Sequence, residues 1–164
     1  MKKIRIYSII SLMIISSFLL GHCQVPCGIY DDALRIHQIK EHISTIEKAM
    51  AQINSLSNGE QTSLKTNQLV RWINTKESHA TLIQTIISDY FLTQRIKIKD
   101  TSTPDRENYI NMTLTLQQML VAAMKCKQTV DPANSQILRE LTFAFSKLYF
   151  DEHGLEHLNA LEHN

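Results

Sequence analysis

Glycine and proline are scarce in this chain, which contains four Gly and three Pro among its 164 residues. Proteins built from many short strands need both residues in their turns, so this scarcity argues against an all-β fold and favours long helices. An excess of charge of one sign is also lacking, because the formal net charge is +1. Nucleic-acid-binding domains usually carry a strongly basic surface, so the composition predicts no nucleic-acid partner.

The chain also lacks a hydrophobic run of membrane-spanning length. Its most apolar segment covers only residues 9–20, whereas a transmembrane helix needs ~20 apolar residues. The basic residues Lys2, Lys3 and Arg5 precede this segment, and the small residue Gly21 follows it. This order is typical of a secretory signal peptide.

We therefore expect cleavage after Gly21, which makes residues 1–21 a signal peptide or cleaved leader and residues 22–164 the mature domain. The mature protein would be exported to the periplasm or the extracellular space, without association with a membrane. Because cleavage removes three cations, the net charge would fall from +1 to −2. A lipoprotein signal with a lipid on Cys23 is disfavoured, because His22 is larger than the residue that normally precedes such a cysteine.

Four stretches of the mature domain carry apolar residues at spacings of three and four, which is the pattern of amphipathic helices. Asp31 and Asp32 can cap the first helix, and the turn residues Ser-Asn-Gly at 57–59 end it. The second helix is expected over about 64–96, with Lys76 interrupting its apolar stripe.

The third and fourth helices begin with the same kind of signal. Thr103 precedes Pro104, and Asp131 precedes Pro132, so each pair combines an N-cap residue with a proline in the first turn. From Asp151 onward the chain is polar and rich in histidine, and we expect a solvated tail.

These patterns predict an all-α fold, an up-down-up-down four-helix bundle with an N-terminal metal-binding hook, because short connections favour antiparallel neighbours. The predicted stripes are Ile36, Ile39, Ile43, Ile46, Met50 and Ile53; Leu69, Ile73, Ala80, Ile83, Ile87 and Phe91; Tyr109, Met112, Leu116, Met119, Leu120 and Ala123; and Ile137, Leu138, Leu141, Phe145, Leu148 and Tyr149.

Residues 22–30, which we call the hook, contain the densest group of metal-binding side chains and follow the expected cleavage site directly. Cleavage would give His22 a free α-amine in addition to its imidazole, while Cys23 and Cys27 provide two thiolates. Amine, amide and two thiolates form a planar N₂S₂ donor set, which suits Ni(II) or Cu(II) better than the tetrahedral Zn(II). The imidazole of His22 is left to act as an axial ligand of an oxidised metal.

The pattern His-Cys-x-x-Pro-Cys-Gly-x-Tyr at 22–30 resembles the nickel-binding hook of nickel-containing superoxide dismutases. Ser-Asp-Tyr-Phe at 88–91 is similar to a stretch on the second helix of that family. The resemblance implies conversion of superoxide to O₂ and H₂O₂, with one nickel ion per chain alternating between Ni(III) and Ni(II). It also implies a homohexamer.

Carried over by position, the resemblance gives each site residue a role. His22 would supply its α-amine and the axial imidazole, Cys23 its amide nitrogen and thiolate, and Cys27 its thiolate. Tyr30 and Tyr90 would close the pocket beside the vacant axial side and exclude larger reductants.

The residues expected to orient the His22 imidazole do not match the family pattern. The family orients its imidazole with a glutamate and an arginine; here His37 or Gln38 occupies the glutamate position, and His79 is the nearest polar candidate for the arginine. We expect Cys126 to be a structural residue without a role in the reaction.

Two other interpretations stay open at this point. The chain could be an exported, non-enzymatic nickel- or copper-binding protein, which dismutase activity of the nickel-loaded protein would exclude. It could also be a helical interaction module with a Cys23–Cys27 disulfide and no metal, which would lower its mass by two hydrogens.

Overall fold

A computed structural model describes residues 31–162 of the chain, and the leader and the hook lie outside these residues. No strand occurs between residues 31 and 162. The elements are α2 (Asp32–Leu56), α3 (Ser63–Thr85), the π-helix η1 (Ile86–Arg95), α4 (Arg106–Gln128), α5 (Pro132–Tyr149) and α6 (Glu152–Glu162).

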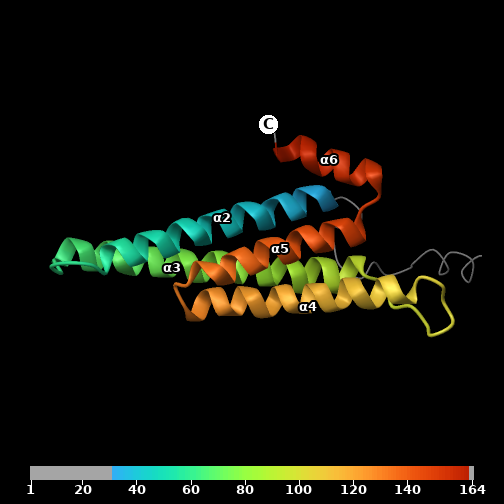
Figure 1. Ribbon diagram of the computed structural model, residues 1–164, viewed down its shortest axis with the longest axis horizontal. Coiled ribbons are helices and arrows are strands. Elements are labelled where there is room, and N and C mark those ends of the chain that lie inside the picture. Colours follow the sequence, from blue (N-terminus) through green and yellow to red (C-terminus); the bar gives the residue numbers. More distant parts are fainter. Residues whose placement is uncertain (1–30, 163–164) are drawn as a thin grey trace, which may run out of the picture.

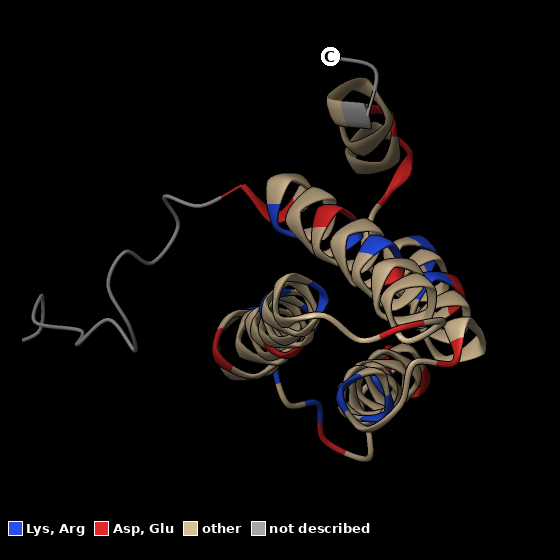
Figure 2. Ribbon diagram, turned by 90° about the vertical axis from the view of Figure 1, so that its left-hand side faces the viewer, with Lys and Arg blue, Asp and Glu red and all other residues tan. Residues whose placement is uncertain are grey.

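The long helices run side by side and alternate in direction, as Figure 1 shows. α2 packs against α3 and α5, and α4 packs against α3, η1 and α5, so the four rods enclose one core. Seen end-on, the rods surround this core and α6 lies outside it (Figure 2). The predicted all-α four-helix bundle is confirmed.

The core is built from the predicted stripes, and all six stripe residues of α2 are buried. Each buried Ile, Leu, Met or Phe side chain contributes roughly 1.5–3 kcal/mol relative to an exposed one. The largest fully buried side chains are Phe91, Phe145, Ile36, Ile39, Ile43, Ile46, Met50, Ile83, Ile87, Leu116, Met119 and Leu138.

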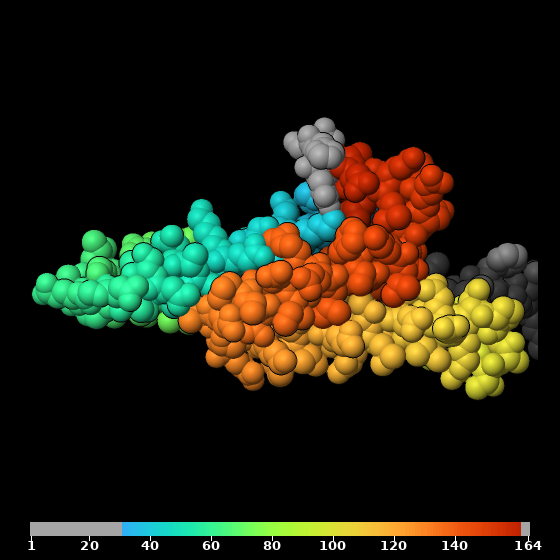
Figure 3. All heavy atoms as spheres, in the orientation of Figure 1, coloured from blue at the N-terminus to red at the C-terminus, as the bar shows by residue number. Residues whose placement is uncertain are grey.

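The tip of the α2–α3 hairpin extends past α4 and α5 (Figures 1 and 3). Lys76 lies opposite the last residues of α4, since its ammonium contacts the carbonyls of Cys126 and Lys127. Ile73 therefore lies beyond the end of α4 and is 36% exposed, although the sequence pattern predicts it in the core. Ile137 of α5 is likewise exposed, contrary to the prediction.

The second predicted helix ends at Arg95, close to the predicted end at about residue 96, but its last part is π-helical instead of α-helical. From Ile86 to Arg95 it is a π-helix, and the amide of Ile96 donates to the carbonyl of Phe91 at 2.9 Å. π-Helical segments are frequent at functional sites because they shift the faces that side chains occupy. Here Tyr90 and Phe91 are both buried, although they are adjacent in the chain.

Two of the three predicted N-cap signals are correct, and the second helix begins at Ser63, next to its predicted start at about residue 64. Asp31 and Asp131 each accept a backbone N–H bond as the N-cap of α2 and α5. The prediction of a start at Thr103 and Pro104 is wrong, because α4 begins at Arg106. Residues 101–105 form turns instead, and the guanidinium of Arg106 donates to the carbonyl of Lys99, which ties the loop to the helix.

The expected solvated tail is also wrong in part, since residues 152–162 form α6 on the outside of α2. Leu158 is 2% exposed and Leu161 packs against the core cluster. His153 and His157 are exposed, as expected of the tail histidines. Their neighbour His163 lies outside the described residues.

Candidate active site at the base of the hook

The described chain begins at Asp31, directly after the last residue of the hook. Asp31 Oδ1 accepts hydrogen bonds from the amides of Ala33 at 2.8 Å and Leu34 at 3.3 Å, which caps α2. Its other oxygen lies 2.6 Å from Nε2 of His157 on α6. The hydrogen bond with His157, supported by the two amides, lowers the pKa of Asp31. Asp31, the residue that follows the hook in the chain, is thus in contact with the C-terminal helix α6.

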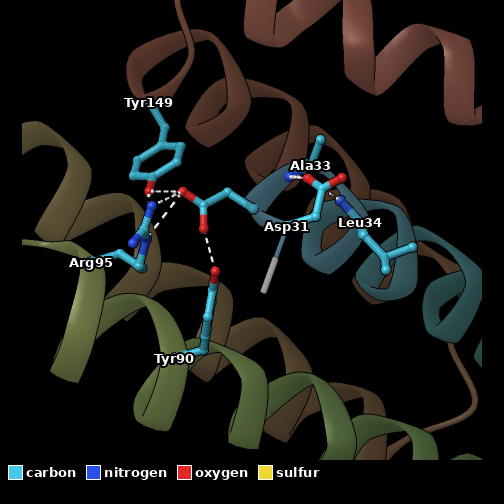
Figure 4. A network of polar contacts seen from close by, with 7 residues as sticks. Asp31, Ala33, Leu34, Tyr90, Arg95 and Tyr149 are labelled. Atoms are coloured by element: carbon cyan, nitrogen blue, oxygen red, sulfur yellow. Dashed lines mark hydrogen bonds and ion pairs between the residues drawn. The ribbon is translucent and has the colours of Figure 1, made fainter. Parts of the chain in front are cut away.

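Asp32 lies in the first turn of α2, and its carboxylate is the centre of a polar network with Tyr90, Arg95 and Tyr149, which Figure 4 labels. Its Oδ1 accepts a hydrogen bond from the hydroxyl of Tyr90. Its Oδ2 accepts from the Tyr149 hydroxyl at 2.6 Å and from Nε of Arg95 at 3.0 Å, and Nη2 of Arg95 completes the ion pair. Arg95 Nε also donates to the hydroxyl of Tyr149 at 3.2 Å.

Burial and the network keep both phenols protonated well into the alkaline pH range. Burial, together with the hydrogen bond to Asp32, raises the pKa of Tyr149 to about 12. The same two causes raise the pKa of Tyr90 above its ordinary range. The hydrogen bonds of Arg95 to Asp32 and Tyr149 outweigh its burial and raise its pKa, so its charge is permanent. The centre therefore pairs one carboxylate with one guanidinium and two neutral phenols.

Tyr90, predicted as a site residue, is 8% exposed and borders a cleft of about 210 Å³. The guanidinium carbons of Arg35 and Arg95 lie 5.7 and 5.9 Å from the centroid of its ring. Of the two, Arg35 lines the cleft together with Asp89, whereas Arg95 is ion-paired with Asp32. Arg35 can therefore offer a local contact to a small anion. The residues that line the cleft are Arg35, Thr85, Ile86, Asp89, Tyr90 and Gln94.

Sequence reasoning missed four residues of this site, namely Asp32, which was predicted only as a helix cap, and Arg35, Arg95 and Tyr149. Arg35 follows Asp31 by about one helical turn, so its position near the start of the first helix could have been recognised from the sequence. Arg95 and Tyr149 are far from Asp32 in the chain, and no local pattern relates them to it.

The structure separates the three residues expected to orient the imidazole of His22. Gln38 Oε1 accepts a hydrogen bond from Arg35 at 2.7 Å, so Gln38 is connected to the cleft beside Tyr90. His37 lies 3.8 Å from Glu41, and its buried Nδ1 has no hydrogen-bond partner among residues 31–162. His79 contacts His42 across the α2–α3 interface, with 3.1 Å between their Nδ1 atoms.

No group of three or more His, Cys, Asp or Glu in the described part of the chain could hold a metal ion. Cys126 is buried, and burial raises the pKa of its thiol to about 11, which disfavours the thiolate that a metal needs. The predicted ligands His22, Cys23 and Cys27, and also Tyr30, lie outside the described residues. Between residues 31 and 162, no helix combines the length and apolarity that a membrane span requires.

A bundle whose cleft is bordered by a buried tyrosine and an arginine, preceded by a chain segment of nitrogen and thiolate donors, has the features of a helical redox metalloprotein. The family model of nickel-containing superoxide dismutase matches residues 18–153, which include the hook and the bundle. The chain therefore belongs to the family of nickel-containing superoxide dismutases. Comparison with curated proteins and with solved structures gives no match.

Membership confirms the resemblance that the hook and the Ser-Asp-Tyr-Phe stretch indicated. The protein is an oxidoreductase that uses nickel to convert superoxide to O₂ and H₂O₂. Nothing in the match favours a non-enzymatic nickel- or copper-binding protein.

Proposed function

We propose that His22, Cys23 and Cys27 hold the nickel ion of this dismutase, and that Tyr30 and Tyr90 border the position of superoxide. The observation that carries the proposal is the hydrogen bond from the Tyr90 hydroxyl to Asp32. Asp32 follows Tyr30 by two residues, and a chain extends by at most ~3.6 Å per residue. The last residue of the hook must therefore lie within about 7 Å of the Asp32 backbone.

The donor chemistry of the hook fits nickel. Thiolates are soft ligands, and an N₂S₂ set favours the square-planar geometry of Ni(II). The bound metal supplies one-electron cycling between Ni(III) and Ni(II), which carries both half-reactions of dismutation. Removal of residues 1–21 would create the terminal amine that this ligand set requires.

The described residues would guide the substrate and control protons. Arg35 lines the cleft beside Tyr90, where it would offer a local contact to superoxide, while Asp32 balances the charge of Arg95. The hydroxyl of Tyr90 donates a hydrogen bond to the Asp32 carboxylate, and burial and that bond keep the hydroxyl protonated. Tyr90 would therefore position water and the anion, while the protons of the second half-reaction come from solvent.

We further propose export to the periplasm or extracellular space after cleavage behind Gly21, and assembly as a homohexamer. Exposed apolar residues on the outer faces of α4 and α5 support an assembly, since burying them between copies is favourable. A groove of about 330 Å³ lies between the two helices, and the exposed Ile137 is among the residues that line it. The exposed apolar residues of α4 and α5 are Ile110, Leu114, Met124, Ile137 and Phe143.

The test compares proteins that differ only at the N-terminus. Protein that begins at His22 should bind about one nickel per chain, show dismutase activity and elute as a hexamer in gel filtration. The same protein with Gly21 retained should lose activity, because the α-amine becomes an amide. Cys27→Ser should lose nickel, while Cys126→Ser should retain both nickel and activity. Full activity with Gly21 retained would refute the terminal-amine ligand.

A further inference from the structure

We propose that Asp32 is a positioning residue of the dismutase site, whose carboxylate holds the Tyr90 phenol and the base of the hook in one fixed arrangement. The inference rests on the proposed role of Tyr90 beside the hook. Asp32 is not expected to touch superoxide or nickel. It would act through Tyr90 and through the start of α2.

The first argument concerns the hydrogen bonds that the Asp32 carboxylate accepts. Both carboxylate oxygens accept hydrogen bonds, and the donors Tyr90 and Arg95 come from η1 whereas Tyr149 comes from α5. The side chain is only 15% exposed. Two other elements of the fold, η1 and α5, thus converge on the residue that follows Tyr30 by two positions.

The second argument is a division of roles between adjacent aspartates. Asp31 already caps α2 and contacts α6 through His157. Asp32 makes no backbone cap bond among those found for α2. Its carboxylate is therefore committed to tertiary contacts, and a role in starting the helix does not explain them.

The third argument is charge balance in a partly buried site. A carboxylate accepts from the guanidinium of Arg95 and from both phenols at once. An amide at position 32 has one acceptor oxygen and adds N–H donors, so it cannot serve all three donors. At least one phenol would then have to reorient, and Tyr90 is the one that borders the cleft.

The role of Asp32 in the reaction follows from its two connections, one through the chain to the hook and one through a hydrogen bond to Tyr90. Anchoring Asp32 to η1 and α5 limits the movement of the chain that leaves the hook, and the same bonds orient the Tyr90 hydroxyl. Small displacements of a positioned group reduce rates by up to ~100-fold. The charged and titratable groups near Tyr90 are Asp32 and Arg35 of α2, Arg95 and Asp89 of η1, and Tyr149 of α5.

Asp32→Asn tests the inference, and Asp31→Asn is the matched control. Both changes remove one negative charge at adjacent positions, and Asn remains a good N-cap at position 31. With nickel content and circular dichroism unchanged, Asp32→Asn should lower kcat/KM by about tenfold or more. Its activity should also decline at a lower alkaline pH, because Tyr90 loses the anionic acceptor that helps to keep it protonated. Asp31→Asn should change neither property.

A second readout does not depend on activity. Absorbance at 295 nm follows tyrosine ionisation, and Asp32→Asn should move the transitions of Tyr90 and Tyr149 to lower pH relative to the unchanged holoenzyme. The double variant Asp32→Asn/Tyr90→Phe should retain only the moved transition of Tyr149. If Asp32→Asn matches Asp31→Asn in rate, pH profile and titration, the inference is wrong. Failure of the proposed function would give a different result, because Cys27→Ser would then retain full activity.

Discussion

The hydroxyl of Tyr149 lies 2.6 Å from Oδ2 of Asp32, although 117 positions separate the two residues in the chain. The contact joins the last residue of α5 to the first residue of α2. It connects α5 to α2 at the end of the bundle where α2 follows the hook in the chain. The stability of the fold and the geometry of the candidate site therefore depend on the same carboxylate.

Tyr149→Phe should remove this hydrogen bond and the one that the hydroxyl accepts from Nε of Arg95, while it keeps the aromatic ring. The Tyr149 ring packs against Phe145 and Phe91, with centroids 5.3 and 5.6 Å apart, and Phe retains that packing. A hydrogen bond to a charged group contributes about 1.5–3 kcal/mol, so the free energy of unfolding should fall by about that amount. Urea denaturation measures it. Tyr109→Phe is the control, and an equal loss there would contradict the assignment.

Acidification should destabilise the protein through the His42–His79 pair. Burial, followed by the neighbouring His79, lowers the pKa of His42 in the folded state. As the pH falls below ~6.5, the ordinary pKa of His, the unfolded chain binds a proton before the folded chain does. Stability is therefore complete above that pH and declines below it.

Replacement of His42 by Gln should reduce the loss of stability between pH 7.5 and pH 5. The exposed His153, changed to Gln, provides a control that should leave the loss unchanged. Urea midpoints at the two pH values decide between these outcomes. An undiminished loss in His42→Gln would assign the acid sensitivity to other groups.

Lys76→Met should destabilise the junction of α3 and α4. Lys76 is 3% exposed, and its ammonium donates to the carbonyl of Cys126 at 2.8 Å and to that of Lys127. Met fills a similar volume but leaves these helix-end carbonyls without their donor, at a cost of about 1–3 kcal/mol. Lys48→Met, at an exposed position of α2, should have little effect on the urea midpoint. A neutral Lys76→Met would show that water replaces the ammonium.

Gly154→Ala should loosen α6. A Cβ at position 154 would lie 2.7 Å from Cδ1 and 3.1 Å from Cβ of Phe150, so Phe150 or the helix must shift. Helix propensity alone would favour Ala by ~1 kcal/mol. Faster hydrogen exchange in α6 is therefore the expected result, with the bundle unaffected. Slower exchange than in Asn159→Ala, an exposed control, would show that propensity outweighs the contact.

The sequence was a good guide wherever one element decides the outcome. The period of the α2 stripe placed Ile36 to Ile53 in the core, because burial follows helical spacing once a helix packs on one side. Asp31 and Asp131 were recognised as caps because the capping bond is local. Ile73 was misplaced because its exposure depends on where a different helix, α4, ends.

The sequence by itself determined the class of protein, since the hook and the helical periodicity are local patterns that identify a family of nickel enzymes. It also indicated Tyr90 through the Ser-Asp-Tyr-Phe stretch. Only the tertiary structure decided that Arg95 and Tyr149 share the carboxylate of Asp32. Their meeting depends on the π-helical winding of η1 and on the return of α5 to the start of α2, and hydrogen bonds across such distances leave no periodic signal in a single sequence.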